Sequence, residues 1–208
     1  IMCLNFTSCS EEEETISISM SKEQRMLYDA YLLQTRKALN QDAANNKIMV
    51  LSMLTRLRQI CISPSLVVDN DLESEKINYC LDMVDNLINT DHKVLIFSQF
   101  VSALDIIQNE LSKRGIEYFI ITGDTNSKRR LEMCDEFNKE SSKEKVFLIS
   151  LKAGGTGLNL VGADTVIHLD PWWNVAIENQ ASDRAHRIGQ QKKVTVFKLI
   201  MNGSIEEK

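Results

Sequence analysis

A glycine-rich segment, Ser150–Leu160, directly follows a short apolar stretch and could contact phosphate. Its three glycines, Gly154, Gly155 and Gly157, let the backbone approach a ligand closely and turn N–H groups toward phosphate oxygens. A dinucleotide-binding fingerprint would need a helix that begins within the glycines, and a P-loop would need G-x-x-x-x-G-K-[ST], which the sequence lacks. Taken alone, the segment is either a phosphate-contacting loop or a flexible turn.

A second segment, Gln180–Gln190, could supply fixed positive charge. Steps of four and three residues place Gln180, Arg184 and Arg187 in one stripe of a predicted helix. Two guanidinium groups on a rigid helix can present pre-organised donors to phosphate oxygens. The alternative is a surface helix in which Asp183 pairs with Arg187, a contact worth little.

Both segments need a rigid frame, and the residues after Asp91 predict one. Short apolar stretches alternate there with amphipathic stretches, and Gly115 and Gly189 stand where two helices are expected to end. Strands that are apolar on both faces, with helices between them, indicate an α/β fold with a parallel sheet covered on both sides. The predicted strands are Val94–Phe97, Tyr118–Ile121, Val146–Ile149, Val166–Leu169 and Val194–Leu199, and the predicted helices are Ser102–Arg114, Lys128–Asn138 and Val175–Ile188.

In proteins with such a sheet, ligands bind at the carboxyl ends of the strands. Polar, glycine-rich and unusual residues follow four of the predicted strands, and we expect the functional site at that edge. These residues are Ser98-Gln99, Thr122-Gly123-Asp124, Ser150-Leu151-Lys152 and Asp170-Pro171-Trp172-Trp173-Asn174.

The first 90 residues follow a mainly helical pattern after one predicted strand, Thr15–Met20. Ser21 and Gln24 have the spacing of a capping box at the start of a first helix. A second helix follows, and a third is predicted to be capped by Ser74. The acidic run Glu11–Glu14 is predicted to be a solvated loop.

We divide the chain into an N-terminal strand and helical region, residues 1–90, and an α/β lobe, residues 91–208. The chain starts with Ile1 and shows no signal-peptide pattern, and Ser204–Lys208 has the pattern of a helix that is just starting. Both ends are therefore expected to continue in a longer protein.

Composition sets limits on the function. A net charge of −5 and a pI near 5.3 argue against a general nucleic-acid-coating protein, so any DNA contact must come from a local patch or from backbone amides. Five scattered cysteines and three histidines form neither a disulfide framework nor a metal-ligand spacing, which fits a reducing cell interior. No apolar run approaches the roughly 20 residues that cross a bilayer, so we expect no membrane partner.

Combined, the glycine-rich and arginine segments resemble a known family. Ser150–Asn159 resembles motif V, and Gln180–Gln190 motif VI, of helicase superfamily two, in the form typical of Swi/Snf-type translocases. Lys93–Phe100 resembles motif IV of that family, and Asp170–Asn174 resembles the version in bacterial and archaeal members.

The region before the lobe also resembles this family. Arg56–Cys61, followed by Pro64, is similar to the helical segment that these proteins carry ahead of the second lobe. Ile62-Ser63 departs from the pattern, because an Asn or Cys followed by His is usual there, but this affects no catalytic residue.

The resemblance implies a RecA-like lobe of an ATP-driven motor that moves along double-stranded DNA. The first lobe of the same parent would hold ATP and the Mg²⁺ ligands, so this chain alone is expected to be inactive. Arg184 and Arg187 would act as arginine fingers toward the γ-phosphate, and Gln180 would orient that helix or the attacking water. Gly157 and Asn159 would line the nucleotide cleft. The implied contacts to DNA phosphates are Gln99, Thr122, Gly123, Lys152, Gly154 and Gly155.

Two other functions stay open: a lobe of a strand-separating DNA or RNA helicase, and a regulatory module of the same fold without motor activity. The residues of motifs V and VI are typical of translocases and argue against a strand-separating helicase. The intact pair of arginines argues against a regulatory module. The expected location is the bacterial cytoplasm and nucleoid, or the nucleus of a eukaryote.

Other conspicuous residues have simpler interpretations. Trp172 and Trp173 are predicted packing anchors, and His186 is a predicted polar helix residue. Lys128-Arg129-Arg130 is a predicted solvated helix start near the DNA side, and Lys192-Lys193 is a predicted charged turn.

Overall fold

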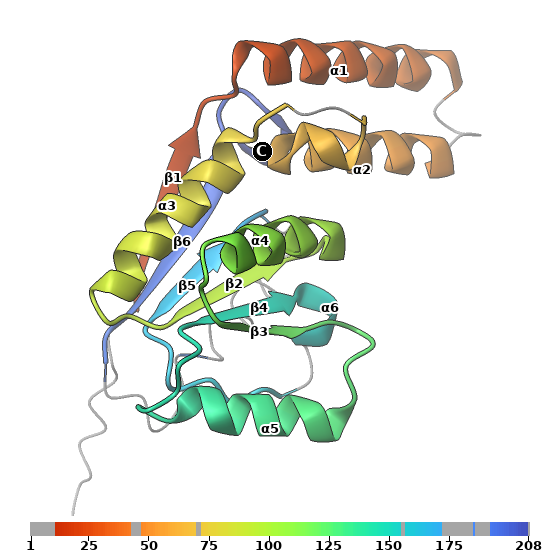
Figure 1. The fold of residues 1–208 in the computed structure, drawn as a ribbon. Helices are drawn as coiled ribbons and strands as arrows, with labels where there is room; N and C mark the ends of the chain where they lie inside the picture. The colour runs from red at the N-terminus through yellow and green to blue at the C-terminus, as the bar shows by residue number, and fades with distance from the viewer. Residues whose placement is uncertain are drawn as a thin grey trace, which may run out of the picture.

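The computed structural model describes residues 11–42, 47–69, 72–154, 157–171, 185 and 192–207. Within them, the chain forms one six-stranded sheet whose strands are all parallel, in the order β1-β6-β5-β2-β4-β3 (Figure 1). The predicted parallel α/β sheet is confirmed. The strands are β1 Glu11–Ile18, β2 Val94–Ser98, β3 Tyr118–Ile121, β4 Val146–Ser150, β5 Thr165–His168 and β6 Val194–Met201.

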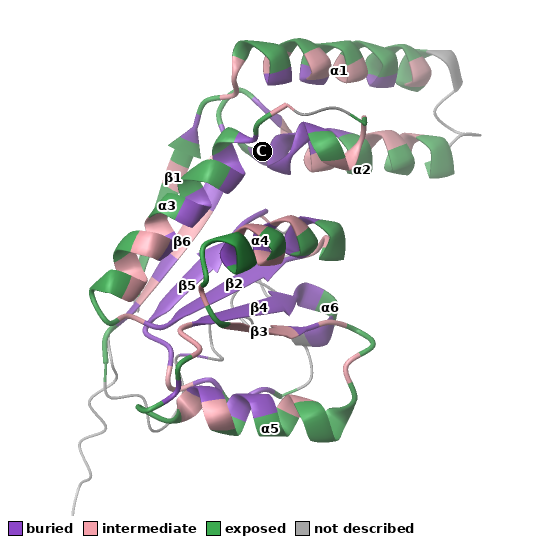
Figure 2. Cartoon of the chain, in the orientation of Figure 1, coloured by how far each residue is buried: buried purple, intermediate pink, exposed green. Residues whose placement is uncertain are grey.

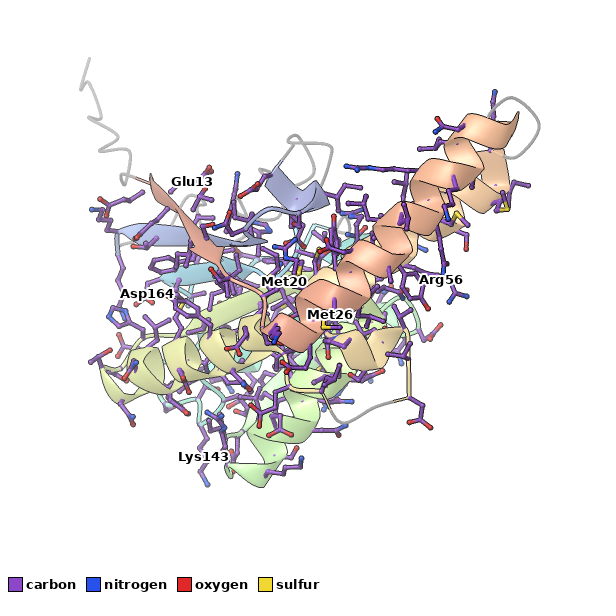
Figure 3. All side chains as sticks on the ribbon, turned by 90° about the horizontal axis from the view of Figure 1, so that it is seen from above. Glu13, Met20, Met26, Arg56, Lys143 and Asp164 are labelled. Carbon is purple, nitrogen blue, oxygen red and sulfur yellow. The ribbon has the colours of Figure 1, made fainter. Side chains whose placement is uncertain are left out.

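Helices cover both faces of this sheet. Helices α3 and α4 lie on one face and α5 on the other, while α1 and α2 form a hairpin that extends beyond the sheet (Figures 1 and 3). The helices are α1 Lys22–Asp42, α2 Lys47–Ile62, α3 Glu75–Asn89, α4 Val101–Lys113, α5 Ser127–Asn138 and α6 Leu151–Gly154, with single 3-10 turns at η1 Pro64–Leu66 and η2 Ile205–Glu207. None of these helices is long and apolar enough to span a membrane.

The core consists of two apolar layers separated by the sheet. Every residue of β2 and β4 is buried, as the purple central strands of Figure 2 show. Side chains alternate along each strand, so Val94 and Ile96 pack in the layer under α3 and α4, whereas Leu95 and Phe97 pack in the layer over α5. Burial on both faces explains why these strands read as continuous apolar runs.

Local signals set the ends of α3 and α4. Ser74 caps α3, because its hydroxyl oxygen accepts a hydrogen bond from the Ile77 N–H at 3.1 Å. Gly115 follows α4 with a φ of +68°, a conformation that glycine adopts without steric cost. Both predicted signals are confirmed.

The acidic run at the start of β1 is a strand, so the predicted loop at Glu11–Glu14 is wrong. Among the described residues, β1 lies at the edge of the sheet next to β6, and the side chains of Glu12, Glu13 and Glu14 are exposed. The Lys193 ammonium nitrogen lies 2.6 Å from a carboxylate oxygen of Glu12, and the Lys198 ammonium nitrogen lies 2.9 Å from a carboxylate oxygen of Glu13. These cross-strand ion pairs offset the low strand propensity of glutamate, and exposed charge also protects the edge from pairing with another chain.

The start of α1 has half of the predicted capping box. The Ser21 hydroxyl accepts a hydrogen bond from the Gln24 N–H at 3.1 Å, as predicted. The Gln24 side chain does not return to Ser21; its amide donates to the Ile60 carbonyl of α2 at 2.7 Å. The Gln24 side chain thus bonds to the neighbouring helix instead of to Ser21, and this hydrogen bond joins α1 to α2.

The root of the hairpin is held at the carboxyl end of β6. Arg25 donates to the carbonyl oxygens of Asn202 and Gly203 at 2.5 and 3.0 Å. The buried hydroxyl of Tyr28 accepts a hydrogen bond from the Ile205 N–H at 2.8 Å, and burial raises the pKa of Tyr28 to about 12. These contacts attach α1 to the carboxyl end of β6 and to η2. The domain boundary at residue 90 stays a prediction.

A buried ion pair links α3 to η2. The Lys76 ammonium lies 2.6 Å from a Glu206 carboxylate oxygen and also donates to the Leu199 carbonyl at 3.0 Å. The same carboxylate oxygen accepts the Met201 N–H at 2.8 Å. Both side chains are at most 1% exposed, so each charge depends on the other for compensation.

We predict that Lys76→Met lowers the free energy of unfolding by about 3–5 kcal/mol, because it leaves the Glu206 carboxylate buried without its cation. Urea unfolding followed by circular dichroism measures the change. Lys113→Met is the control, since the Lys113–Glu110 pair lies at the surface and its loss should change stability little. Equal losses in the two variants would contradict the assignment.

We predict that His168 makes stability depend on pH between about 6.5 and 4. Burial, helped by the charge of Lys198, lowers the pKa of His168 from 6.5 to about 4, and the ring stacks on Phe97 with centroids 5.7 Å apart. In that window the unfolded chain binds a proton that the folded chain does not, so stability falls as the pH falls, by at most about 3 kcal/mol. The His168→Phe variant should show a smaller change of unfolding free energy between pH 6.5 and pH 4 than the wild type, as measured by urea unfolding at several pH values. The same slope of unfolding free energy against pH in both proteins would refute the role of His168.

Candidate functional site

The predicted DNA-contacting residues gather along one edge of the sheet. Gln99 follows β2, Thr122 and Gly123 follow β3, and Lys152 and Gly154 lie in α6 directly after β4. Because β2, β4 and β3 are parallel neighbours in that order, these residues lie side by side at the carboxyl ends of the strands. Gly155 lies outside the described residues.

Arg130 fixes the loop that follows β3. Its guanidinium donates to the carbonyl oxygens of Thr125, Thr122 and Gly123 at 2.7, 3.1 and 3.3 Å. The Thr122 N–H donates in turn to the Thr125 hydroxyl at 3.0 Å. Lys128, Arg129 and Arg130 lie in the first turn of α5, so the predicted helix start is confirmed. Lys128 and Arg129 are exposed as predicted, whereas Arg130 is half-buried and holds the shape of a predicted phosphate-contacting loop.

The segment after β4 presents its polar residues outward. Leu151 and Ala153 are buried, whereas Lys152 between them is exposed, so the short helix α6 is anchored by its apolar side. Gly157 is exposed and has a φ of +69°, and a Cβ added there would meet no heavy atom of the described residues within 4 Å. The glycine is thus required by backbone conformation rather than by close packing against the described residues.

Asn138, which no sequence signal singled out, holds the next stretch of chain. Its amide nitrogen donates to the Asn159 carbonyl at 3.0 Å, and its amide oxygen accepts the Gly162 N–H at 2.9 Å. A Cβ at Gly162 would lie 2.8 Å from the Asn138 Cα, so only glycine fits. Asn159 itself is exposed between the buried Leu158 and Leu160, which leaves its side chain accessible.

A buried carboxyl joins the carboxyl ends of β5 and β2. Asp170 accepts hydrogen bonds from the Ser98 hydroxyl and from the Gln99 N–H, the latter at 3.3 Å. Burial raises the pKa of Asp170, and the hydrogen bonds from Ser98 and Gln99 and the charge of Lys76 oppose that rise. Arg58 of α2 donates to the Pro171 carbonyl at 2.6 Å, so the helical region also contacts this point. The sequence placed Ser98 and Asp170 at the expected functional edge and Arg58 in a segment that resembles the family, but it did not predict that these three residues would lie close together.

The predicted catalytic residues Gln180, Arg184 and Arg187 lie outside the described residues, as do Trp172, Trp173 and His186. Ala185, in the middle of the arginine segment, is described and is buried in the apolar layer over α5. The roles of the three catalytic candidates therefore stay predictions.

Metal ligands were not predicted in this chain. Among the described residues no three His, Cys, Asp or Glu side chains are grouped so that they could hold a metal ion.

The described cysteines Cys61, Cys80 and Cys134 are buried free thiols. Burial raises the pKa of Cys61 and Cys80 to about 12 and that of Cys134 to about 11. They pack as apolar side chains, as predicted.

Comparison with known proteins gives the family. Residues 75–189 match the helicase conserved C-terminal domain. An uncharacterized ATP-dependent helicase of Mycoplasma genitalium is 40% identical over 198 residues, 93% of this chain and 19% of that protein. The human SWI/SNF-related matrix-associated actin-dependent regulator of chromatin subfamily A member 1 is 36% identical over 210 residues, 95% of this chain and 20% of that protein. The chain thus spans about a fifth of the length of these relatives.

Solved structures agree with the sequence comparison. The Sulfolobus solfataricus SWI2/SNF2 ATPase C-terminal domain has a TM-score of 0.79 at 30% identity and covers 95% of this chain and 82% of its own. The SWI2/SNF2 ATPase core of the same organism in complex with dsDNA has a TM-score of 0.81 at 30% identity, over 95% of this chain and 42% of its own. The chain therefore belongs to the helicase conserved C-terminal domain family, in the RecA-like form found in Swi2/Snf2 ATPases.

Proposed function

We propose that this chain is the second motor lobe of an ATP-dependent translocase that moves along double-stranded DNA. The observation that carries the proposal is the row of loops after β2, β4 and β3, which brings Gln99, Lys152, Thr122 and Gly123 to one edge of the sheet. Among similar proteins, the Sulfolobus SWI2/SNF2 core was solved in complex with dsDNA, which supports a duplex as the ligand of this edge.

The chemistry of this edge suits a phosphate backbone. The loop after β3 offers backbone groups held by Arg130, and exposed Lys152 adds a cation on α6. Such contacts fix the register of a protein on DNA without reading bases, so movement should be independent of sequence. With a net charge of −5, the lobe depends on these local groups rather than on an overall positive field.

ATP is the proposed nucleotide, held mainly by a first lobe of the same parent protein together with its Mg²⁺. In this chain, the exposed Gly157 and Asn159 fit the wall of a nucleotide cleft. Arg184 and Arg187 would place positive charge where negative charge develops on the transferred phosphoryl group, and Gln180 would orient the arginine segment or the attacking water.

We predict that the 208-residue chain alone hydrolyses ATP no faster than a buffer blank, with or without duplex DNA. The sequence has no phosphate-binding P-loop, so nothing in it replaces the first lobe. A phosphate-release assay with and without plasmid DNA measures this. DNA-stimulated turnover by the chain alone would refute its role as half of a motor.

In the full-length parent, we predict that Arg184→Ala or Arg187→Ala lowers DNA-stimulated kcat by about 10³–10⁵-fold, the effect typical of an arginine finger. Nucleotide affinity should change much less, because the first lobe makes most ATP contacts. Lysine should restore little activity, since a flexible point charge does not reproduce the planar guanidinium. The measurements are DNA-stimulated ATPase, nucleotide binding and thermal melting.

The control for the arginine variants is Arg36→Ala, which removes an exposed arginine of α1, outside the row of loops that carries the predicted DNA contacts. It should keep normal turnover. Near-normal ATPase in both Arg184→Ala and Arg187→Ala would remove the finger assignment. Lost ATPase together with a collapsed melting temperature would instead show that the arginines hold the helix in place.

A further inference from the structure

Asn159 is held by helix α5 at both of its backbone polar atoms. The Asn159 N–H donates to the Cys134 sulfur, and the Asn138 amide nitrogen donates to the Asn159 carbonyl oxygen at 3.0 Å. Cys134 and Asn138 are four residues apart and therefore share one face of α5, which covers the side of the sheet opposite α3 and α4 (Figure 1). Because both backbone atoms are bonded to one helix, α5 sets the direction in which the exposed Asn159 side chain leaves the main chain.

A second contact of Asn138 fixes the distance between this segment and α5. The Asn138 amide oxygen accepts the Gly162 N–H at 2.9 Å, so one side chain bonds to two points of the segment that are three residues apart. The two backbones also touch, since a Cβ at Gly162 would lie 2.8 Å from the Asn138 Cα. Asparagine suits this double contact because its side chain has both a donor and an acceptor.

The end of α5 that carries Asn138 is itself held in place. The ammonium group of Lys93, a residue only 5% exposed, donates to the carbonyl oxygens of Phe137 and Lys139, each at 2.6 Å. These carbonyls flank Asn138 at the C-terminal end of the helix, where carbonyl groups lack an intrahelical partner and a cation is favourable. Asn138 is therefore presented to the segment from a fixed main chain.

The segment needs this support, because its own structure is irregular. Residues 157–160 belong to no helix or strand, and Gly157 has a φ of +69°. Leu158 and Leu160 are buried on either side of Asn159, but apolar contacts are not directional and leave the rotation of the chain between them open. Packing thus places the segment, and the polar contacts from α5 decide which way Asn159 faces.

We propose that Asn138 is a positioning residue for nucleotide binding, which holds the backbone of Asn159 so that the Asn159 side chain meets the nucleotide in a single orientation. This inference rests on the proposed function, in which Asn159 lines the nucleotide cleft. Asn138 does not contact the nucleotide; it acts through the carbonyl of Asn159, and Cys134 assists through the N–H of the same residue.

The central variant is Asn138→Asp, which separates the two contacts of Asn138. A carboxylate keeps an acceptor for the Gly162 N–H but has no donor for the Asn159 carbonyl. In the full-length parent, kcat/KM for ATP should fall about 3–10-fold, the effect of one lost hydrogen bond. The loss should come from a higher KM at nearly unchanged kcat, since contacts made equally to bound ATP and to the transition state act on KM. A purely structural role would instead reduce the amount of active enzyme, which lowers kcat at unchanged KM.

A double-mutant cycle tests whether Asn138 acts through Asn159. Asn159→Ala alone should raise the KM for ATP, and adding Asn138→Asp should raise it no further, because no side chain is then left to misplace. Asn78→Asp is the matched control, since it puts the same new charge on an exposed asparagine of α3, on the other side of the sheet. This control should keep the wild-type KM.

Hydrogen–deuterium exchange on the 208-residue chain supplies a readout besides activity. Asn138→Asp should speed exchange in peptides covering 157–162 and leave peptides covering 122–125 unchanged, since Arg130 holds that loop. If Asn138→Asp does not fold, two Cys134 variants give the answer. Cys134→Ala removes the acceptor of the Asn159 N–H and should show faster exchange and a higher KM, whereas Cys134→Ser keeps an acceptor and should stay closer to wild type.

The outcomes distinguish this inference from the proposed function. Unchanged exchange at 157–162 in Asn138→Asp, or additive effects on KM in the cycle, would overturn the positioning role. A wild-type KM in Asn159→Ala would overturn it too, because Asn159 would then not meet the nucleotide, while DNA-stimulated ATPase in the parent would still support a motor lobe. A wild-type parent without such ATPase would refute the proposed function and the nucleotide part of this inference, and the exchange data would still decide whether Asn138 orders the segment.

Discussion

The site depends on one constraint, the parallel hydrogen-bonded register of β2, β4 and β3. Ser98 pairs with Ser150, and Ile121 pairs with Ile149, so the three strands end at nearly the same level. Strands of mixed direction would send alternate loops to opposite ends of the sheet. Because all run the same way, loops from residues 98, 122 and 150 meet at one edge although they are far apart in the sequence.

Polar groups buried at the ends of the strands fix the geometry of the turns, which the apolar core alone does not determine. The core layers set the distance between helices and sheet, but apolar contacts are not directional and tolerate small shifts. The Lys76–Glu206 pair and the Asp164 and Asp170 carboxyls supply direction at the points where strands become turns. Arg130 and Asn138 do the same for the loops after β3 and α6. Each of these groups binds backbone atoms, so each fixes chain geometry rather than a single side chain.

The sequence predicted the parts of the fold that repeat regularly or have local signals. Continuous apolar runs located the central strands, and Ser74 and Gly115 marked helix ends, because burial and capping leave signatures within a few residues. It did not predict that Glu11–Glu14 would extend an edge strand, since the stabilising partners Lys193 and Lys198 lie about 180 residues away. The contacts of Arg130 and Asn138 were not predicted, because their partners are backbone carbonyl and N–H groups, which every residue has and which leave no side-chain pattern in the sequence. Asp170 was placed at the expected functional edge, but its bonds to Ser98 and Gln99, about 70 residues earlier, were not predicted. The resemblance located the predicted phosphate-contacting residues, and the structure brings the described ones together without testing their roles.

The pairing of β1 with β6 has a mechanical consequence. The two strands are parallel over eight register pairs, from Glu11↔Val194 to Ile18↔Met201, so β1 is entered and β6 is left at opposite ends of the same ribbon. A force that pulls the chain backward from residue 11 and forward from residue 201 acts along both strands and slides them past each other. The backbone hydrogen bonds then share the load together instead of opening one at a time. The outer edge of this sheet is therefore built to carry tension in shear, the loading direction in which a pair of strands resists separation most strongly.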